Sequence, residues 1–237
     1  MKIQRFADKE KTRANAQKAL SVVFEKNKNA PILFLSSGGS ALELLEGLSL
    51  TNKKALITLG MLDDRFTDTD SEEVSNFLQL TKTKFFFEML SGGAMLIDTS
   101  VQSNESLSDM AERFHASLQG WRMIHPSGVI IATMGIGADG HTAGIMSNMP
   151  KNKFGTFFEN DEVYAVGYDT GGNGEHRARV TVTFPFLRMI DHALVYIVGA
   201  EKERALASIM SKKGNLQETP ARIMREMKDV SIFTDIQ

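Results

Sequence analysis

A glycine-rich stretch near the middle of the chain ends in a histidine, and this combination of residue types suggests chemistry. Residues 134–144 read MGIGADGHTAG, with glycines in the spacing G-x-G-x-x-G and His141 directly after them. Histidine can act as a general base near neutral pH, and a nearby carboxylate such as Asp139 can orient its ring. The alternative is a histidine that only hydrogen-bonds its own turn.

The same glycine spacing is a fingerprint of dinucleotide binding, but the surrounding sequence excludes that interpretation. Such a fingerprint opens a long helix and is followed, about 20 residues later, by an acidic residue that ends the next strand. Here Pro150 allows at most a short helix before it, and Asp161 and Glu162 begin the next strand. We therefore expect no NAD binding.

A second glycine-containing segment, SSGGS at residues 36–40, lies between an apolar strand and a helix. Glycines let the backbone approach a ligand closely, and the amides at a helix N-terminus favour an anion. The segment therefore predicts a phosphate loop. A tight turn with Ser40 as the helix N-cap is the alternative.

A third polar segment, LDDRFTDTDSEEVSNF, follows the next strand. If the chain stays extended, Asp63 and Asp64 point to opposite faces, so at most one of them faces a site. Arg65 can hold a phosphate or a carboxylate through two hydrogen bonds. The alternative is a solvated acidic loop in which Ser71 or Ser75 caps the following helix.

Metal binding is not supported by these residues. An EF-hand loop that starts at Asp68 would place Glu73 at the glycine position and Gln79 at the last ligand position, which excludes calcium. The chain has no cysteine and only five histidines, so no catalytic metal set is visible. Arg179, which begins a later strand, is a further cation that could meet an anionic substrate or remain solvated.

Apolar strands that alternate with helices must position these residues. The expected helices span 8–27, 40–48, 74–90, 105–120, 201–212 and 220–227, and the expected strands span 31–35, 53–60, 94–97, 127–135, 162–169, 179–184, 192–199 and 230–235. This alternation predicts an α/β fold with a mainly parallel, Rossmann-like sheet covered on both faces, as a single domain over residues 1–237. Ligands bind beyond the carboxyl ends of such strands, so segments 36–40, 63–76 and 135–142 are expected to converge.

The composition of the chain argues against several classes of binding partner and against a membrane location. The 237 residues carry a formal net charge of −2, so we expect no nucleic-acid or anionic membrane surface. The N-terminus lacks the apolar core of a signal peptide, and no apolar run approaches the roughly 18 residues of a membrane helix. With no cysteine, the chain is expected to be cytoplasmic.

Six segments, in this order, make the chain similar to a known family. The segments are SSGGSALELL, DDRFTDTDSEEVSNF, MGIGADGHTAG, RVTVTFPFL, ALVYIVGAEKERAL and PARIM. They resemble the 6-phosphogluconolactonases, which share a superfamily with glucosamine-6-phosphate isomerase. The resemblance implies hydrolysis of 6-phospho-D-glucono-1,5-lactone to 6-phosphogluconate in the oxidative pentose phosphate pathway, without metal or redox cofactor. It also implies a small-molecule sugar-phosphate lactone as partner, in a monomer or small homo-oligomer.

The resemblance also assigns roles to residues. It implies that His141 is the general base, that Asp139 positions it, and that Asp63 and Arg65 belong to the catalytic set. The residues that it implies in substrate or phosphate binding are Ser37, Gly38, Gly39, Ser40, Asn76, Gly137 and Arg179. Whether Arg65 or Arg179 is the main phosphate contact stays open.

The chain departs from the family pattern at several positions. The family's D-E-R reads Asp-Asp-Arg here, and S-L-F-P after H-T-A is replaced by residues 144–147, Gly-Ile-Met-Ser. The loop at 170–177 lacks the usual lysine and prolines, and Phe233 stands near the place of a common tryptophan. We expect these changes to affect loop closure and phosphate contacts rather than the chemistry.

Two other functions are compatible with the resemblance. The isomerase normally supplies a glutamate after the histidine, and none occurs between His141 and Glu159. A non-catalytic sugar-phosphate-binding regulator would commonly carry a helix-turn-helix extension, for which we expect no room in this chain. The lactonase is therefore the favoured prediction.

Overall fold

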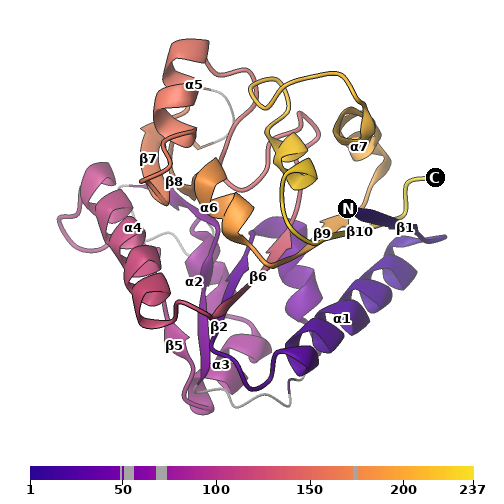
Figure 1. Cartoon of the computed structure of the whole chain (residues 1–237), viewed down its shortest axis with the longest axis horizontal. Helices are drawn as coiled ribbons and strands as arrows, with labels where there is room; N and C mark the ends of the chain where they lie inside the picture. Colours follow the sequence, from indigo (N-terminus) through magenta and orange to yellow (C-terminus); the bar gives the residue numbers. More distant parts are fainter. Residues whose placement is uncertain (49, 51–55, 68–73, 173–175) are drawn as a thin grey trace.

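A seven-stranded parallel sheet forms the centre of the computed structural model, which describes residues 1–48, 50, 56–67, 74–172 and 176–237 (Figure 1). The strand order is β1-β10-β9-β6-β2-β3-β5, and all neighbouring strands are parallel. The strands are β1 (Lys2–Arg5), β2 (Ile32–Ser36), β3 (Ile57–Met61), β5 (Met95–Leu96), β6 (Val129–Met134), β9 (His192–Ile197) and β10 (Val230–Thr234). The predicted mainly parallel sheet is confirmed.

Helices cover both faces of this sheet, as predicted. One face carries α1 (Lys9–Lys26), the 3-10 helix η1 (Gly39–Leu45), α2 (Asn76–Thr81) and α3 (Lys84–Ser91). On the other side lie α4 (Leu107–Ile124), α6 (Phe184–Met189), α7 (Glu203–Met210) and the 3-10 helix η4 (Pro220–Arg225). Helix α5 (Lys151–Phe158) belongs to the same core but packs on the second sheet described below. Alternation along β2 separates two cores, because Leu33 and Leu35 face the second group while Ile32 and Phe34 face the first.

Helix α1 shows how local sequence determines where a helix begins and which of its faces is buried. Asp8 caps α1 by accepting a hydrogen bond from the Lys11 amide at 2.7 Å, as its residue type predicts. The buried residues Ala16, Leu20 and Phe24 then recur every four positions and pack against the sheet. Local capping and helical periodicity therefore agree with the tertiary fold here.

A second, three-stranded sheet lies beside the first and is antiparallel. It consists of β4 (Asp63–Phe66), β8 (Ala178–Val182) and β7 (Ala165–Asp169), in that order. The sequence predicted β7 and β8 as strands but treated residues 63–66 only as a polar segment. Pairing with β8 makes that segment a strand and sets Arg65 opposite Arg179.

Several boundaries differ from the predictions. Strand β1 and helix α6 were not predicted, and residues 40–48 form a 3-10 helix over 39–45 rather than an α-helix. The predicted helix 74–90 is two helices, because Thr83 caps a new one by accepting from the Phe86 amide. The expected short helix lies after Pro150 as α5, not before it. Two of the expected features lie partly outside the described residues. Residues 68–73 include Ser71 and the first half of the rejected calcium loop, and residues 51–55 include the start of the expected strand 53–60.

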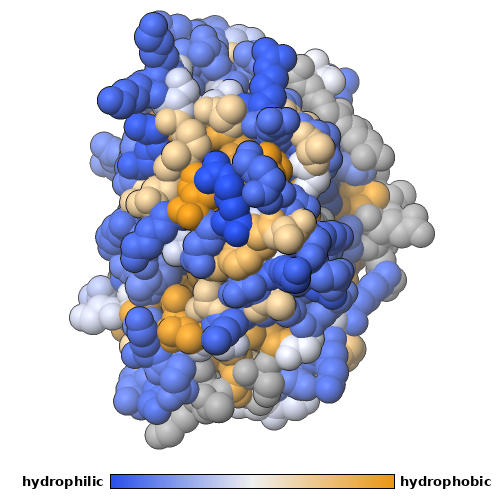
Figure 2. Space-filling model, turned by 90° about the vertical axis from the view of Figure 1, so that its right-hand side faces the viewer, coloured by the Kyte–Doolittle hydropathy of each residue, from blue (hydrophilic) through white to orange (hydrophobic). Residues whose placement is uncertain are grey.

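Hydrophilic side chains cover most of the face that carries α1, α7 and both chain ends, with apolar residues in small groups between them (Figure 2). None of the helices in the described ranges is both long enough and apolar enough to cross a bilayer. The large apolar side chains with the highest exposed fractions lie elsewhere, on α3, on β5 and at the end of α4. They are Phe87, Met95, Met123 and Ile124.

Candidate active site

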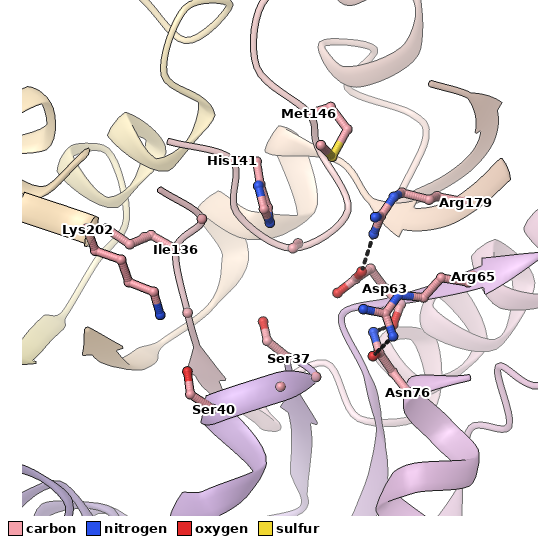
Figure 3. A pocket seen from close by; sticks show the side chains of 15 residues that line it. Ser37, Ser40, Asp63, Arg65, Asn76, Ile136, His141, Met146, Arg179 and Lys202 are labelled. Carbon is pink, nitrogen blue, oxygen red and sulfur yellow. Dashed lines mark hydrogen bonds and ion pairs between the residues drawn. The ribbon is translucent and has the colours of Figure 1, made fainter. Parts of the chain in front are cut away.

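A pocket of about 380 Å³ opens at the carboxyl ends of β2 and β6 (Figure 3). All three segments that the sequence predicted to converge contribute to it, together with Arg179 from β8 and Lys202 after β9. Its lining residues are Ser37, Gly38, Gly39, Ser40, Asp63, Arg65, Asn76, Gly135, Ile136, Gly137, His141, Ala143, Met146, Arg179 and Lys202.

His141, which is held by Asp139, forms part of one wall of the pocket. The His141 ring points into the pocket, and its Nδ1 lies 2.5 Å from Asp139 Oδ1 (Figure 3). This contact assigns the Nδ1 proton to the side of Asp139, which leaves Nε2 free as a base. Burial raises the pKa of Asp139, but the hydrogen bond and charge of His141 outweigh it, so this pKa lies well below its ordinary value.

The glycine at 137 is required by this pair. A Cβ added to Gly137 would lie 2.1 Å from His141 Nδ1 and 2.5 Å from Asp139 Oδ1. The Gly137 amide also donates to the His141 carbonyl at 2.9 Å, which closes the turn between them. The middle glycine of the G-x-G-x-x-G spacing therefore permits the close approach of His141 and Asp139.

The opposite wall carries a buried ion pair. Arg179 Nη1 lies 3.7 Å from Asp63 Oδ2, and both side chains are less than a tenth exposed. Burial raises the pKa of Asp63, while the positive charge of Arg179 acts against that shift. The Arg179 Nε is buried without a hydrogen-bond partner among the described residues.

Asp64 points away from the pocket, as expected for adjacent residues of a strand. Its carboxylate accepts from the amides of Arg65, Asn76 and Phe77 and from the hydroxyls of Ser75 and Thr99. Burial raises the pKa of Asp64 to about 6 and outweighs these five donors. Asp64 therefore fixes the start of α2 against β4.

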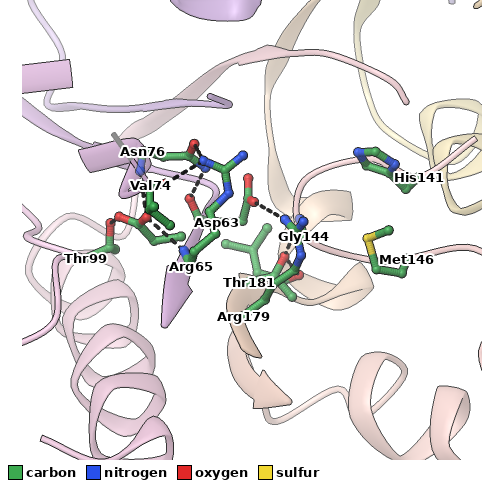
Figure 4. Close-up of polar contacts among 12 residues, drawn as sticks. Asp63, Arg65, Val74, Asn76, Thr99, His141, Gly144, Met146, Arg179 and Thr181 are labelled. Carbon is green, nitrogen blue, oxygen red and sulfur yellow. Dashed lines mark hydrogen bonds and ion pairs between the residues drawn. The ribbon is translucent and has the colours of Figure 1, made fainter. Parts of the chain in front are cut away.

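That junction places Asn76 and Arg65 in the pocket (Figure 4). Asn76 Oδ1 accepts from Arg65 Nη1 at 2.5 Å, and Asn76 Nδ2 donates to the Asp63 carbonyl at 2.9 Å. Arg65 Nη1 also donates to the Val74 carbonyl at 2.8 Å. A Cβ on Gly38 would lie 2.0 Å from Asn76 Oδ1, so only glycine at position 38 leaves room for the Asn76 side chain beside Arg65.

The predicted phosphate loop lies at the floor of the pocket. Gly39 has a φ of +62°, a conformation that glycine adopts without strain. The Ser37 hydroxyl is buried without a hydrogen-bond partner, and Ser40 faces the cavity (Figure 3). The following helix is a seven-residue 3-10 helix, so the predicted α-helix N-terminus at this loop is wrong.

The pocket collects the predicted residues, with one exception and one charged addition. Asp139 does not line it and reaches it only through His141. Lys202 was missed, and Figure 3 shows its side chain extending into the pocket near Ser40. Burial lowers the pKa of Lys202. Its position just after the carboxyl end of a predicted strand is the signal that could have identified it.

Two departures from the family pattern have structural counterparts. A Cβ on Gly144 would lie 2.9 Å from Thr181 Cβ and 3.0 Å from Asp63 Cβ, so glycine at 144 allows close packing behind Asp63. In the segment 170–177, residues 173–175 lie outside the described residues, and Arg177 forms an exposed pair with Asp169 at 2.6 Å. Within the described ranges, no three His, Asp or Glu side chains are grouped in a way that suits a metal ion.

Comparisons with known proteins agree with this fold. The chain resembles a solved 6-phosphogluconolactonase from Shewanella baltica (TM-score 0.77, 13% identity, 99% of this chain and 96% of that one). It also resembles one from Trypanosoma brucei (TM-score 0.76, 19% identity, 98% and 95%). At these identities the likeness concerns the fold alone.

Two sequence comparisons match different lengths of the chain: one known protein matches less than half of it, and one family matches nearly all of it. A 6-phosphogluconolactonase from Synechocystis is 28% identical over 104 residues, which are 44% of this chain and only 39% of that relative. The family described as "Glucosamine-6-phosphate isomerases/6-phosphogluconolactonase" matches residues 7–233, nearly the whole chain. The protein is therefore a member of the glucosamine-6-phosphate isomerase/6-phosphogluconolactonase family.

Proposed function

We propose that the protein hydrolyses 6-phospho-D-glucono-1,5-lactone to 6-phosphogluconate, with His141 as general base and without a metal. One observation carries this proposal: a histidine held by an aspartate faces a pocket whose described lining includes three cations and one carboxylate. The cations are Arg65, Arg179 and Lys202, in a chain of net charge −2. Such a local excess of positive charge suits an anionic substrate next to a base.

The phosphate is proposed to bind at the glycine loop. The buried Ser37 hydroxyl lacks a partner, and Ser40 lies on the same side of the pocket as Lys202 (Figure 3). An ammonium group and loop donors together can hold a phosphate with charge-assisted hydrogen bonds. The sugar ring would then extend toward His141, with Arg65 and Arg179 on the far wall.

The chemical step follows from the free Nε2 of His141. It accepts a proton from water while the water oxygen forms a bond to the lactone carbonyl carbon. The resulting oxyanion is stabilised by Arg65, a contribution of about 3 kcal/mol for a well-placed donor. The bond from carbon to the ring oxygen then breaks, and His141 returns the proton to that leaving oxygen. Asp139 keeps the ring oriented throughout.

The isomerase reaction, the other activity in the family's description, is the alternative. An isomerase of this fold is expected to place a glutamate near the histidine. Among the described lining residues, Asp63 is the only carboxylate, and it is paired with Arg179. We therefore expect lactone hydrolysis and no release of ammonia from glucosamine-6-phosphate.

One experiment tests the proposal directly. Purified protein is given the lactone, generated in situ, with EDTA present and the spontaneous hydrolysis rate subtracted. Turnover well above background, together with no ammonia from glucosamine-6-phosphate, is expected. Ammonia release without lactonase activity would reverse the ranking, and loss of hydrolysis in EDTA that a divalent metal restores would reject the metal-free step.

A further inference from the structure

We propose that Ser147 is a positioning residue that holds Asp139 and, through it, His141. The Ser147 hydroxyl donates to Asp139 Oδ2 at 2.8 Å. The other oxygen, Oδ1, receives His141 Nδ1 at 2.5 Å and the His141 amide at 3.3 Å. Each oxygen of the Asp139 carboxylate therefore accepts at least one hydrogen bond from the protein. The inference rests on the proposed function, because it gives Ser147 a role in the same reaction.

Asp139 needs such a partner because it is only partly buried. Its side chain is 42% exposed, so water can compete for the carboxylate and the group can rotate about its Cβ–Cγ bond. Ser147 is 7% exposed, and its hydroxyl donates to Asp139 from the protein interior. A buried donor on Oδ2 limits rotation and keeps Oδ1 aimed at the ring.

The backbone on both sides of Ser147 is fixed, which makes it a suitable anchor. The Met146 amide donates to the buried Tyr168 hydroxyl at 3.1 Å. The Asn148 amide donates to the Gln217 carbonyl at 2.9 Å. Ser147 thus lies between two anchored peptide groups, so its hydroxyl has a defined position relative to Asp139.

This role explains a residue that the pocket itself does not use. Ser147 belongs to the segment 144–147, where the sequence departs from the family pattern, and it does not line the pocket. Its only route to the reaction is through Asp139, which keeps the proton on His141 Nδ1 and leaves Nε2 as the base. Without Ser147, Asp139 turns more freely and part of the His141 population carries its proton on Nε2.

The kinetic test uses Ser147→Ala, Ser147→Cys and Ser147→Thr. Loss of the donor in Ser147→Ala is expected to lower kcat between about 3- and 100-fold, with KM changed less than about twofold, because orientation and not binding is affected. Cys, a weak donor of similar volume, is expected to behave like Ala, and Thr, which keeps the hydroxyl, to recover most of kcat. Ser106→Ala, which removes a serine–aspartate bond at the start of α4, is the control expected to leave kcat unchanged.

A double variant separates positioning from general destabilisation. In an Asp139→Ala background, Ser147→Ala should change kcat less than about twofold, because its only route is gone. An equal loss of kcat in both backgrounds would overturn the proposal. So would an unchanged kcat in both Ser147→Ala and Ser147→Cys.

A spectroscopic test does not depend on the reaction. Ring-nitrogen NMR of ¹⁵N-histidine protein, with His141 assigned by His141→Gln, reports which nitrogen carries the proton. Wild type should show the Nδ1–H form and Ser147→Ala a mixture. If wild type does not hydrolyse the lactone but the tautomer still depends on Ser147, the proposed function fails and the positioning role stands. An identical tautomer in wild type and Ser147→Ala rejects the positioning role.

Discussion

At the scale of single residues, the described part of the chain offers a second histidine–aspartate pair to compare with His141 and Asp139, and the settings of the two pairs differ. His192 Nδ1 lies 3.0 Å from Asp229 Oδ2 at the amino end of β9. His141 and Asp139 form a shorter contact at the opposite end of the sheet, next to the cationic pocket. The pairing alone is thus not distinctive, and the surroundings of His141 are what favour catalysis.

His141→Ala is therefore expected to lower kcat by roughly 10² to 10⁴-fold while the protein stays folded, because the general base is lost. His192→Ala removes the matched pair on the surface and should keep near-normal turnover. Lactone hydrolysis corrected for background, with circular dichroism for folding, measures both. Near-normal turnover in folded His141→Ala would remove this residue from the mechanism.

Lys202→Met should raise KM for the phosphorylated lactone by about 10- to 100-fold with little change in kcat, because a cation that holds the phosphate acts equally on ground and transition state. Hydrolysis of unphosphorylated gluconolactone should not change. Lys228→Met, which breaks a surface pair with Asp191, is the control. A similar loss with both lactones would show that Lys202 does not bind the phosphate.

At the scale of elements, the sequence predicted those parts of the fold that local patterns determine. Apolar runs identified the parallel strands except β1, and the rule that ligands lie beyond the carboxyl ends of such strands predicted that the three loops converge. Strand β4 was missed because its residues DDRF carry no apolar alternation and become a strand only through pairing with β8. Lys202 was missed because its position after a predicted strand places it only at the carboxyl edge of the sheet, and the tertiary fold is what brings it to the pocket beside Ser40.

The junction of the glycine loop with α2 provides an element-scale prediction. Gly38→Ala would place a Cβ 2.0 Å from Asn76 Oδ1 and displace Asn76 from Arg65. We expect kcat/KM to fall at least tenfold, with a loss of about 1–3 kcal/mol in unfolding free energy. Steady-state kinetics of lactone hydrolysis and chemical denaturation measure the two effects.

Gly120→Ala provides the matched comparison. This glycine lies in α4 with nothing within 4 Å of an added Cβ. Alanine should therefore raise the free energy of unfolding by about 0.5–1 kcal/mol and leave turnover unchanged. Equal kinetics for Gly38→Ala and Gly120→Ala would contradict the proposed need for a glycine beside Asn76.

At the scale of the whole molecule, the buried carboxylate of Asp64 links stability to pH. Its pKa is raised to about 6 in the folded protein, above the ordinary value of 3.8. The folded state therefore binds the proton more tightly, and this contribution to stability is fully present below pH 3.8 and lost as the pH rises through 6. The size of the loss is about 3 kcal/mol.

Chemical denaturation of wild type and Asp64→Asn between pH 4 and 8 measures this contribution. The advantage of wild type over the variant should be largest near pH 4 and shrink by about 2 kcal/mol by pH 7. NMR titration of the Asp64 carboxyl carbon should show a midpoint near 6. A midpoint below 4 would show that the five hydrogen-bond donors outweigh burial.

The pairing of β1 with β10 has a consequence for the order in which the molecule assembles during synthesis. Lys2–Arg5 of β1 pair with Ser231–Thr234 of β10, whereas α1 packs on η1 as well as on β9 and β10. Helix α1 can therefore dock on residues that follow it closely in the chain, but β1 can join the sheet only after residues 230–234 have been made. Because contacts so distant in sequence form slowly, β1 is expected to be among the last strands to join the sheet.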